Sequence, residues 1–226
     1  MALYFSCGKT SGPKATRDYR PRSSTFLGLQ RLLASYFPQN QIFRGLTHII
    51  SYVASPGLIR QVGKITRLIM GERKGVQNES LERVFQELDV PGVHAEISTE
   101  IQVAQWTKFL YIASVAPVGC LAGYPIGGYR SDPHFRQMIE DSMKEIVTLA
   151  RAFGVILPET IVNDSMRVMD AAPAESTTSL QRDYVSGKQT EIEAFSGFIS
   201  KECKNKKIPS PVNDLLYQKL GCSFRV

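Results

Sequence analysis

The order of hydrophobic and polar residues changes character along the chain, and the first part has the pattern of strands. Between residues 42 and 72, β-branched residues predominate, with breaks at Ser55-Pro56-Gly57 and at Gly63. This pattern predicts two or three short strands joined by turns. A short amphipathic helix is predicted over residues 79–88, and one further strand over residues 93–98.

Helical spacing dominates from about Thr99 to Leu220. A helix start is predicted at Asp132-Pro133, because a capping residue precedes a proline in the first turn. Gly154 predicts the end of that helix. A second helix is predicted to begin at Pro158, and its buried face is predicted to hold Ile161, Ser165, Val168 and Met169.

Two further helices are predicted near the C-terminus, and one more near the start of the chain over residues 26–36. Thr190–Glu193 has the form of a capping box, which predicts a helix that runs to about Cys203. The lysine-rich residues 201–207 are predicted to form a solvated loop. Prolines then lead into a last helix over residues 212–220.

One long apolar stretch in the helical part contains a single charged residue. Between Glu100 and Arg130 only Lys108 is ionised at neutral pH. The run is long enough to raise the question of a membrane span, but prolines and glycines crowd its second half, which favours a buried helix followed by turns. Burial lowers the pKa of a lysine, which suits proton donation near neutral pH. The alternative is a lysine whose stem lies along the helix while its ammonium group reaches solvent.

Composition narrows the class of protein only slightly. The 226 residues carry a net charge of +6, and the basic, acid-poor segment 1–25 is predicted to be a disordered tail, with a transit peptide as the alternative. The four cysteines form no C-x-x-C pair and the three histidines lie far apart, so we expect reduced thiols and no metal site. No recognised nucleic-acid-binding motif accompanies the charge, and we expect no nucleic-acid partner and no membrane partner.

Two polar segments add candidate site residues. In residues 175–183, several hydroxyl groups precede a short helix, where they either cap the helix or bind a carboxylate or phosphate group. In residues 187–198, two acids stand in the first turn of a predicted helix. The helix dipole alone would explain both, but the capping box uses only Glu193 and leaves Glu191 free for another role.

These segments carry a resemblance to a known family. WTKFL, TTSLQRD, TEIEAFSGF and IPSPVNDLLYQKL, in this order, resemble the C-terminal domain of ketopantoate reductases (2-dehydropantoate 2-reductases). Residues 45–72 resemble the final strands of the family's nucleotide-binding domain. The similarity runs from about Leu29 to Leu220.

The resemblance and the pattern together imply a mainly α fold class. An all-helical C-terminal domain, of the 6-phosphogluconate-dehydrogenase C-terminal type, is expected after the remnant of an α/β Rossmann domain. The expected divisions are a tail over 1–25, the incomplete end of a nucleotide-binding domain over 26–98, the helical domain over 99–221 and a tail over 222–226.

The resemblance also implies a reaction. In this family NADPH (the cofactor NADP in its reduced form) delivers hydride to the keto carbon of ketopantoate, which gives pantoate for pantothenate and coenzyme A biosynthesis. A lysine at the position of Lys108 acts as general acid, a glutamate matching Glu191 binds substrate and orients the lysine, and a serine matching Ser179 contacts substrate. A small 2-keto acid is the implied substrate, and a cytoplasmic location is expected, with a mitochondrial one as the alternative.

Two departures from the family pattern leave alternatives open. Asparagines that many members carry one and two helical turns after the lysine are Ile112 and Ala116 here, so a related 2-keto acid is an alternative substrate. The glycine-rich G-x-G-x-x-G loop is absent, so we expect a chain that lacks most of the cofactor domain. A homodimer or another partner would then cover an exposed sheet edge. The alternative is a non-catalytic helical interaction module, or a shortened gene product of the family.

Overall fold

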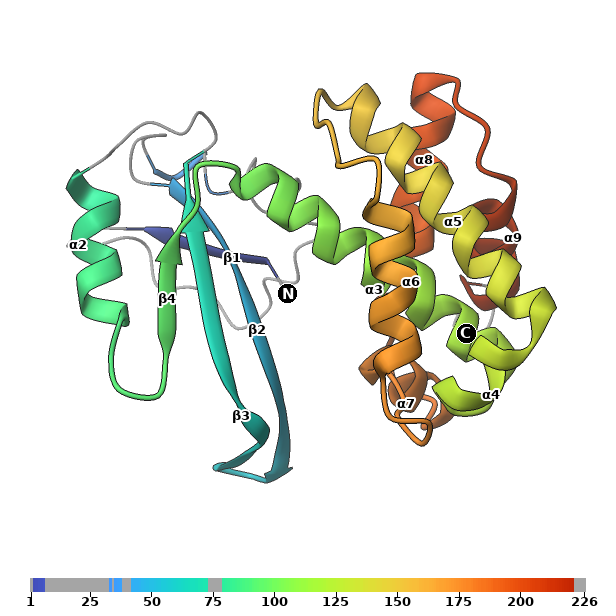
Figure 1. The fold of residues 1–226 in the computed structure, drawn as a ribbon, viewed down its shortest axis with the longest axis horizontal. Helices are drawn as coiled ribbons and strands as arrows, with labels where there is room; N and C mark the ends of the chain where they lie inside the picture. Colours follow the sequence, from blue (N-terminus) through green and yellow to red (C-terminus); the bar gives the residue numbers. More distant parts are fainter. Residues whose placement is uncertain (1, 7–32, 34, 38–41, 73–78, 222–226) are drawn as a thin grey trace. The chain divides into compact units, whose positions relative to one another are not determined.

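The computed structural model describes residues 2–6, 33, 35–37, 42–72 and 79–221 (Figure 1). The chain divides into two compact units, Met1–Gln105 and Trp106–Val226. Helices predominate, so the predicted mainly α fold class is confirmed. Most of the helix predicted over residues 26–36, and the tail predicted over 222–226, lie outside the described residues.

The first unit is built on a mixed sheet in the order β1-β2-β3-β4. Strand β2 pairs antiparallel with β1 and with β3, whereas β3 and β4 are parallel. Parallel neighbours need a crossover connection, and α2 lies between them in the chain. The elements are β1 (Ala2–Ser6), β2 (Ile42–Ser55), β3 (Leu58–Gly71), α2 (Glu79–Leu88) and β4 (His94–Ile97).

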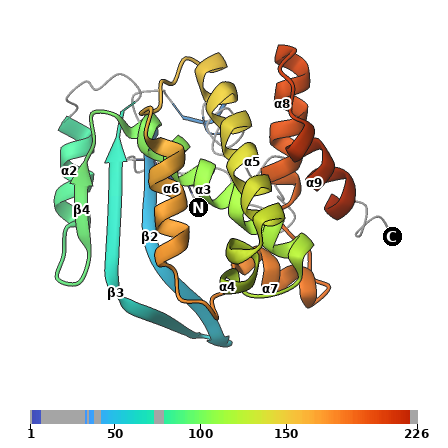
Figure 2. The same ribbon diagram turned by 45° about the vertical axis from the view of Figure 1, so that its right-hand side comes forward.

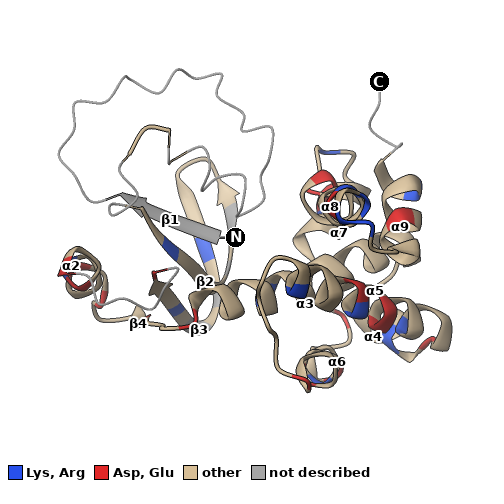
Figure 3. Ribbon diagram, turned by 90° about the horizontal axis from the view of Figure 1, so that it is seen from above, with Lys and Arg blue, Asp and Glu red and all other residues tan. Residues whose placement is uncertain are grey.

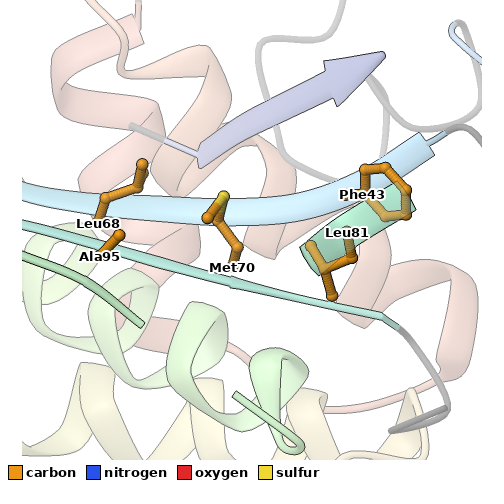
Figure 4. Packing of buried hydrophobic residues seen from close by; sticks show 5 residues of the cluster. All are labelled: Phe43, Leu68, Met70, Leu81 and Ala95. Carbon is orange, nitrogen blue, oxygen red and sulfur yellow. The ribbon is translucent and has the colours of Figure 1, made fainter. Parts of the chain in front are cut away.

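The described side chains of this sheet form a buried apolar cluster on each face. Leu68 and Met70 of β3 pack with Leu81 of α2 and with residues of the neighbouring strands, as Figure 4 shows. Ile69, which lies between them on β3, instead joins Leu46 and Ile101. Successive residues of a strand point to opposite faces, so β3 contributes to both clusters.

Two predictions for this unit need correction. The predicted break at Gly63 is wrong, because β3 continues through it: the pairing register shifts between His48 and Ile50, and Gly63 has φ +80°. The glycine therefore lies in a bulge of one long hairpin, where left-handed backbone is needed. The expected disordered tail does not hold for Ala2–Ser6, which form β1 along the edge of β2.

The second unit is helical, and Figure 2 shows α5, α8 and α9 beside one another. Helix α3 (Ile101–Ala122) begins in the first unit and continues into the second. The other elements are α4 (Ile126–Ser131), α5 (Pro133–Ala152), α6 (Ile161–Ala171), α7 (Ser179–Val185), the π-helix η2 (Glu193–Gly197), α8 (Phe198–Lys206) and α9 (Pro211–Gly221). Among the helices described, none has both the length and the apolar character of a membrane span.

The predicted bounds of α5 are confirmed by its caps. Asp132 Oδ1 accepts a hydrogen bond from the backbone N–H of His134 at 2.8 Å, and Pro133 opens the first turn. Gly154 follows the helix with φ +77°, a conformation that costs glycine little. Short-range chemistry therefore suffices to delimit this helix.

Elsewhere in the second unit, side-chain packing overrides the local pattern. Val168 was expected on the buried face of α6 but is 57% exposed, whereas Met166 is 7% exposed and takes a place in the core. The predicted loop over residues 201–207 is largely helix α8. Lys206 stabilises its last turn, because Nζ donates to the carbonyl of Ala152 at 3.1 Å and lies 4.2 Å from the ring centroid of Phe153.

A buried polar network joins α5 to the start of α9. Glu145 accepts hydrogen bonds from the backbone N–H groups of Val212 (2.8 Å) and Asn213 (3.0 Å), and from Asn213 Nδ2 at 2.7 Å. Ser142 Oγ lies 3.0 Å from Ser114 Oγ and 3.4 Å from Asn213 Oδ1, which brings α3 into the same network. The carboxylate of Glu145 thus satisfies N–H groups that a helix start leaves open.

Candidate active site

Helix α3 presents one partly accessible face in the second unit. Figure 3 shows α3 almost without charged residues, whereas α5 and α8 carry several. From Trp106 to Cys120 most side chains are buried, and the partly accessible ones are Thr107, Lys108, Tyr111 and Ile112. At 100° per residue these positions fall within an arc of about 140°, so they share one side of the helix.

Lys108 is half-buried on this face. Burial lowers the pKa of its ammonium group below the ordinary lysine value. The lysine is therefore a better proton donor near neutral pH than an exposed one would be.

Glu191 lies in a segment that reaches the Lys108 turn of α3. Its carbonyl accepts hydrogen bonds from the N–H groups of Ala194 (2.9 Å) and Phe195 (3.1 Å), which begin the π-helix η2. The ring of Phe195 lies edge-on to Phe109 with a centroid separation of 6.3 Å. The segment that carries Glu191 is thus packed beside the residue that follows Lys108, while the Glu191 side chain itself is exposed.

The capping box predicted at Thr190–Glu193 is wrong. No side-chain capping hydrogen bond is made at the start of η2, and the hydroxyl of Thr190 is buried without a hydrogen-bond partner. Glu193 Oε2 instead accepts from the hydroxyl of Tyr217 at 2.7 Å. A tertiary partner on α9 therefore takes the carboxylate that the local motif would have used. The resulting π-helix is a rare element that often occurs at functional sites.

Ser179 is the first residue of α7, and its side chain is exposed. The cap of this helix is Thr178, whose hydroxyl accepts from Gln181 N at 3.1 Å, so the hydroxyl of Ser179 is not the capping group. The Gln181 side chain meets α3 at Gly119. Gly119 lies on the same side of α3 as Lys108 but three turns later, which is about 16 Å along the helix axis.

The loop before Ser179 is held by backbone hydrogen bonds from α4. The carbonyls of Ala174 and Ser176 accept from the N–H groups of Gly127 and Ile126, at 2.9 and 3.0 Å. This anchoring fixes where α7 begins. The structure therefore brings the Glu191 segment to α3 at Phe109 and the helix of Ser179 to α3 at Gly119.

Comparison with known families identifies this helical domain. Residues 100–221 match the family model described as the C-terminal domain of ketopantoate reductase PanE/ApbA. The chain belongs to the ketopantoate reductase family.

Individual relatives agree with this membership. An uncharacterised oxidoreductase of Bacillus subtilis is 29% identical over 193 residues, which are 83% of this chain and 62% of the relative. A 2-dehydropantoate 2-reductase of Halobacterium salinarum is 25% identical over 186 residues, or 82% of this chain and 61% of the relative. The chain thus spans about three fifths of the length of these two proteins.

Solved structures show the same fold. A ketopantoate reductase from Ralstonia eutropha superposes with a TM-score of 0.69 at 23% identity, over 79% of this chain and 58% of that one. D-Mandelate dehydrogenase in complex with NADH gives a TM-score of 0.79 at 16% identity, over 87% of this chain and 66% of that one. At these identities the likeness speaks for the fold alone.

Within this ketopantoate reductase domain, the sequence pattern missed two residues of the Lys108 face, Thr107 and Tyr111. Tyr111 stands three residues after Lys108, so the two side chains are neighbours on the helix. The pattern did single out Ile112 and Ala116, but their settings differ: Ile112 is partly accessible, whereas Ala116 is 0% exposed. The spacing of Tyr111 was a usable signal, but its partial accessibility depends on the fold.

The described residues do not supply a phosphate cradle for NADP. The chain contains no G-x-G-x-x-G sequence, and the connection from β3 to α2 lies largely outside the described residues. We therefore assign no cofactor-binding residue. Within the described ranges, no group of three or more His, Cys, Asp and Glu side chains could hold a metal ion.

Proposed function

We propose that this chain carries the substrate-binding part of a reductase that converts a 2-keto acid of the 2-dehydropantoate type to the 2-hydroxy acid. The observation that carries the proposal is Lys108, which stands half-buried with a lowered pKa in a domain of the ketopantoate reductase family. Pantothenate biosynthesis, NADP as cofactor and a cytoplasmic setting (or a mitochondrial one) belong to the same proposal. So does a homodimer, which has a parallel in the dimeric ketopantoate reductase of Staphylococcus aureus.

Reduction of a keto group requires a hydride at carbon and a proton at oxygen. The proposed hydride donor is NADPH, and no described residue is assigned to it. Lys108 is proposed to supply the proton. Its Nζ–H donates to the carbonyl oxygen, and the proton passes to that oxygen as alkoxide charge develops. The neutral amine then regains a proton from solvent. Because burial lowers its pKa, this lysine gives up the proton more readily than an exposed lysine.

Glu191 and Ser179 take binding roles in this proposal. The carboxylate of Glu191 is proposed to orient the Lys108 ammonium group, and the packing of Phe195 on Phe109 supports the required proximity of the two segments. The hydroxyl of Ser179 is proposed to donate to the substrate carboxylate. The role of Ser179 is proposed from the family motif alone. The contacts of α7 do not support it directly, because α7 meets α3 at Gly119, which lies three turns along the helix from Lys108.

The proposal is tested by turnover of 2-dehydropantoate with the full chain, followed as loss of NADPH absorbance. Lys108→Ala is expected to lower kcat by about 100-fold or more, the usual contribution of a general acid, while circular dichroism stays unchanged. Lys144→Ala is the matched control, because Lys144 is exposed on α5 and pairs with Glu140. Measurable turnover that is equal in Lys108→Ala and in the parent chain would contradict the general-acid role.

A non-catalytic helical interaction module is the second candidate, and the lack of a G-x-G-x-x-G sequence in this chain favours it. Calorimetric titration of the full chain with NADPH, with NADH as control, tests whether the chain holds the cofactor by itself. Binding in the micromolar range supports the reductase. A folded sample that binds neither nucleotide is expected of the interaction module and also of a reductase that takes its cofactor domain from another chain.

A further inference from the structure

Helices α3, α4 and α7 each contribute one residue to a small buried region of the helical unit. Gly119 belongs to α3, Tyr129 to α4 and Gln181 to α7. A side chain built on Gly119 would place its Cβ 3.2 Å from Gln181 Oε1 and 3.3 Å from Tyr129 Oη. The two oxygens therefore border the same place, beside the stretch of helix surface that Gly119 leaves without a side chain.

Both oxygens are buried, and neither has a hydrogen-bond partner among the described residues. Tyr129 is 0% exposed and Gln181 is 3% exposed, so bulk solvent does not reach them. A buried polar atom without a partner costs free energy, and protein interiors commonly satisfy such atoms with an ordered water molecule. Two such atoms at one place indicate a partner that they share.

We propose that Tyr129 Oη and Gln181 Oε1 hold one internal water molecule between α3, α4 and α7. This inference does not rest on the proposed reductase function, because it concerns a region about three turns along α3 from Lys108. The water molecule would join α7 to the other two helices, since each of its two ligands comes from a different helix.

The orientation of the Gln181 amide is fixed by its other end. Gln181 Nε2 donates a hydrogen bond to the carbonyl of Tyr124 at 2.9 Å. The reversed amide would direct Oε1 at that carbonyl oxygen, where two acceptors repel each other. Oε1 is therefore held toward the buried region. Because an amide oxygen only accepts hydrogen bonds, the group that binds it has to be a donor.

The hydroxyl of Tyr129 complements this requirement, because it can both donate and accept. A water molecule can donate one hydrogen to Gln181 Oε1 and use its second hydrogen or a lone pair for Tyr129 Oη. The occupant also has to be small, because the two oxygens and the ring atom Cε1 of Tyr129 all lie within 3.3 Å of the position that a Gly119 Cβ would take.

The titratable groups around this region favour a neutral occupant over an ion. Burial raises the pKa of Tyr129; Tyr111 and Cys120 add to this effect, and Arg130 opposes it. Burial also raises the pKa of Cys120 to about 12, so the phenol and the thiol are both uncharged at physiological pH. The guanidinium group of Arg130 donates from Nη1 to carbonyls at the end of α6. The region thus offers hydrogen-bonding oxygens without a charge to balance an ion.

Crystallography of the full chain, at a resolution that shows ordered water, tests the site directly. We expect one water peak within hydrogen-bonding distance of both oxygens, about 2.7–3.2 Å. Tyr129→Phe and Gln181→Met each remove one of the two ligands, and the peak should be lost in each variant. A parent structure without the peak, or one in which Tyr129 Oη bonds directly to Gln181 Oε1, overturns the inference.

Urea unfolding measures the link between the two side chains in solution. If one water molecule joins them, the double variant should lose less stability than the two single variants predict together, by at least about threefold in the unfolding equilibrium constant. Tyr124→Phe is the matched control, because it removes a hydroxyl from a tyrosine that is 37% exposed on the same side of α7, and its effect should add to that of Gln181→Met. Additive losses for Tyr129→Phe and Gln181→Met would contradict a shared water molecule.

Discussion

Replacement of Glu145 by alanine is expected to destabilise the helical unit more than any surface change on α5. The substitution removes the acceptor for the N–H groups of Val212 and Asn213 at the start of α9. It also leaves the Asn213 amide, which is 0% exposed, without the bond to Glu145 Oε2. Loss of a helix cap costs about 0.5–2 kcal/mol, and an unsatisfied buried donor about 1–3 kcal/mol. Together they suggest a loss of about 3 kcal/mol in the free energy of unfolding.

The assay for Glu145→Ala is urea unfolding followed by fluorescence of the single tryptophan. Trp106 is 1% exposed and belongs to the helical unit, so its emission reports on that unit. The matched control is Glu140→Ala, which removes an exposed ion pair with Lys144 and should cost at most about 1 kcal/mol. If both variants lose the same stability, the buried network does not lock α9 onto α5 and the reasoning fails.

The pH dependence of Glu145 has a definite sign. Burial raises the pKa of this carboxyl above its ordinary value, although the bonds from Asn213 and Val212 act in the opposite direction. The folded chain therefore holds the proton more tightly than the unfolded chain. Stability from this group is present below the unfolded pKa and is lost as pH rises through the folded pKa. Relative to Glu145→Gln, which does not titrate, the parent chain should thus be most stable at the acidic end.

Three further predictions concern single positions. Lys108→Met should raise stability at neutral pH, because the lowered pKa of Lys108 means that the folded chain binds fewer protons than the unfolded one. The difference in urea midpoint between this variant and the parent chain should shrink as pH rises toward 10.5. A difference in midpoint that widens with pH would contradict this reasoning. Gly119→Ala places a Cβ 3.2 Å from Gln181 Oε1, so we expect a loss of about 1–3 kcal/mol in the same unfolding assay, and an unchanged midpoint would mean that α7 shifts freely. Lys207→Gly should stabilise the end of α8 by about 0.5–1 kcal/mol, since Lys207 has φ +57°, and a lower melting temperature would refute it.

Sequence alone determined those features whose causes lie within one helical turn or one strand. The bounds of α5 follow from Asp132-Pro133 and Gly154, and the helix α2 and the strand β4 were predicted from their spacing. Lys108 was found because it is the single charge in a long apolar stretch. In each case the signal and its structural consequence involve neighbouring residues, so no distant partner was needed to predict them.

Tertiary structure decided the features for which a local motif competes with a distant partner. Glu193 bonds to Tyr217 in place of capping its own helix, and Lys206 finds a carbonyl and an aromatic ring on α5 and its C-terminal end, which favours helix over loop. The accessibility of Tyr111 beside a fully buried Ala116 likewise depends on which elements cover α3. These outcomes are set by burial and by contacts between residues remote in sequence, which periodicity and capping patterns do not contain.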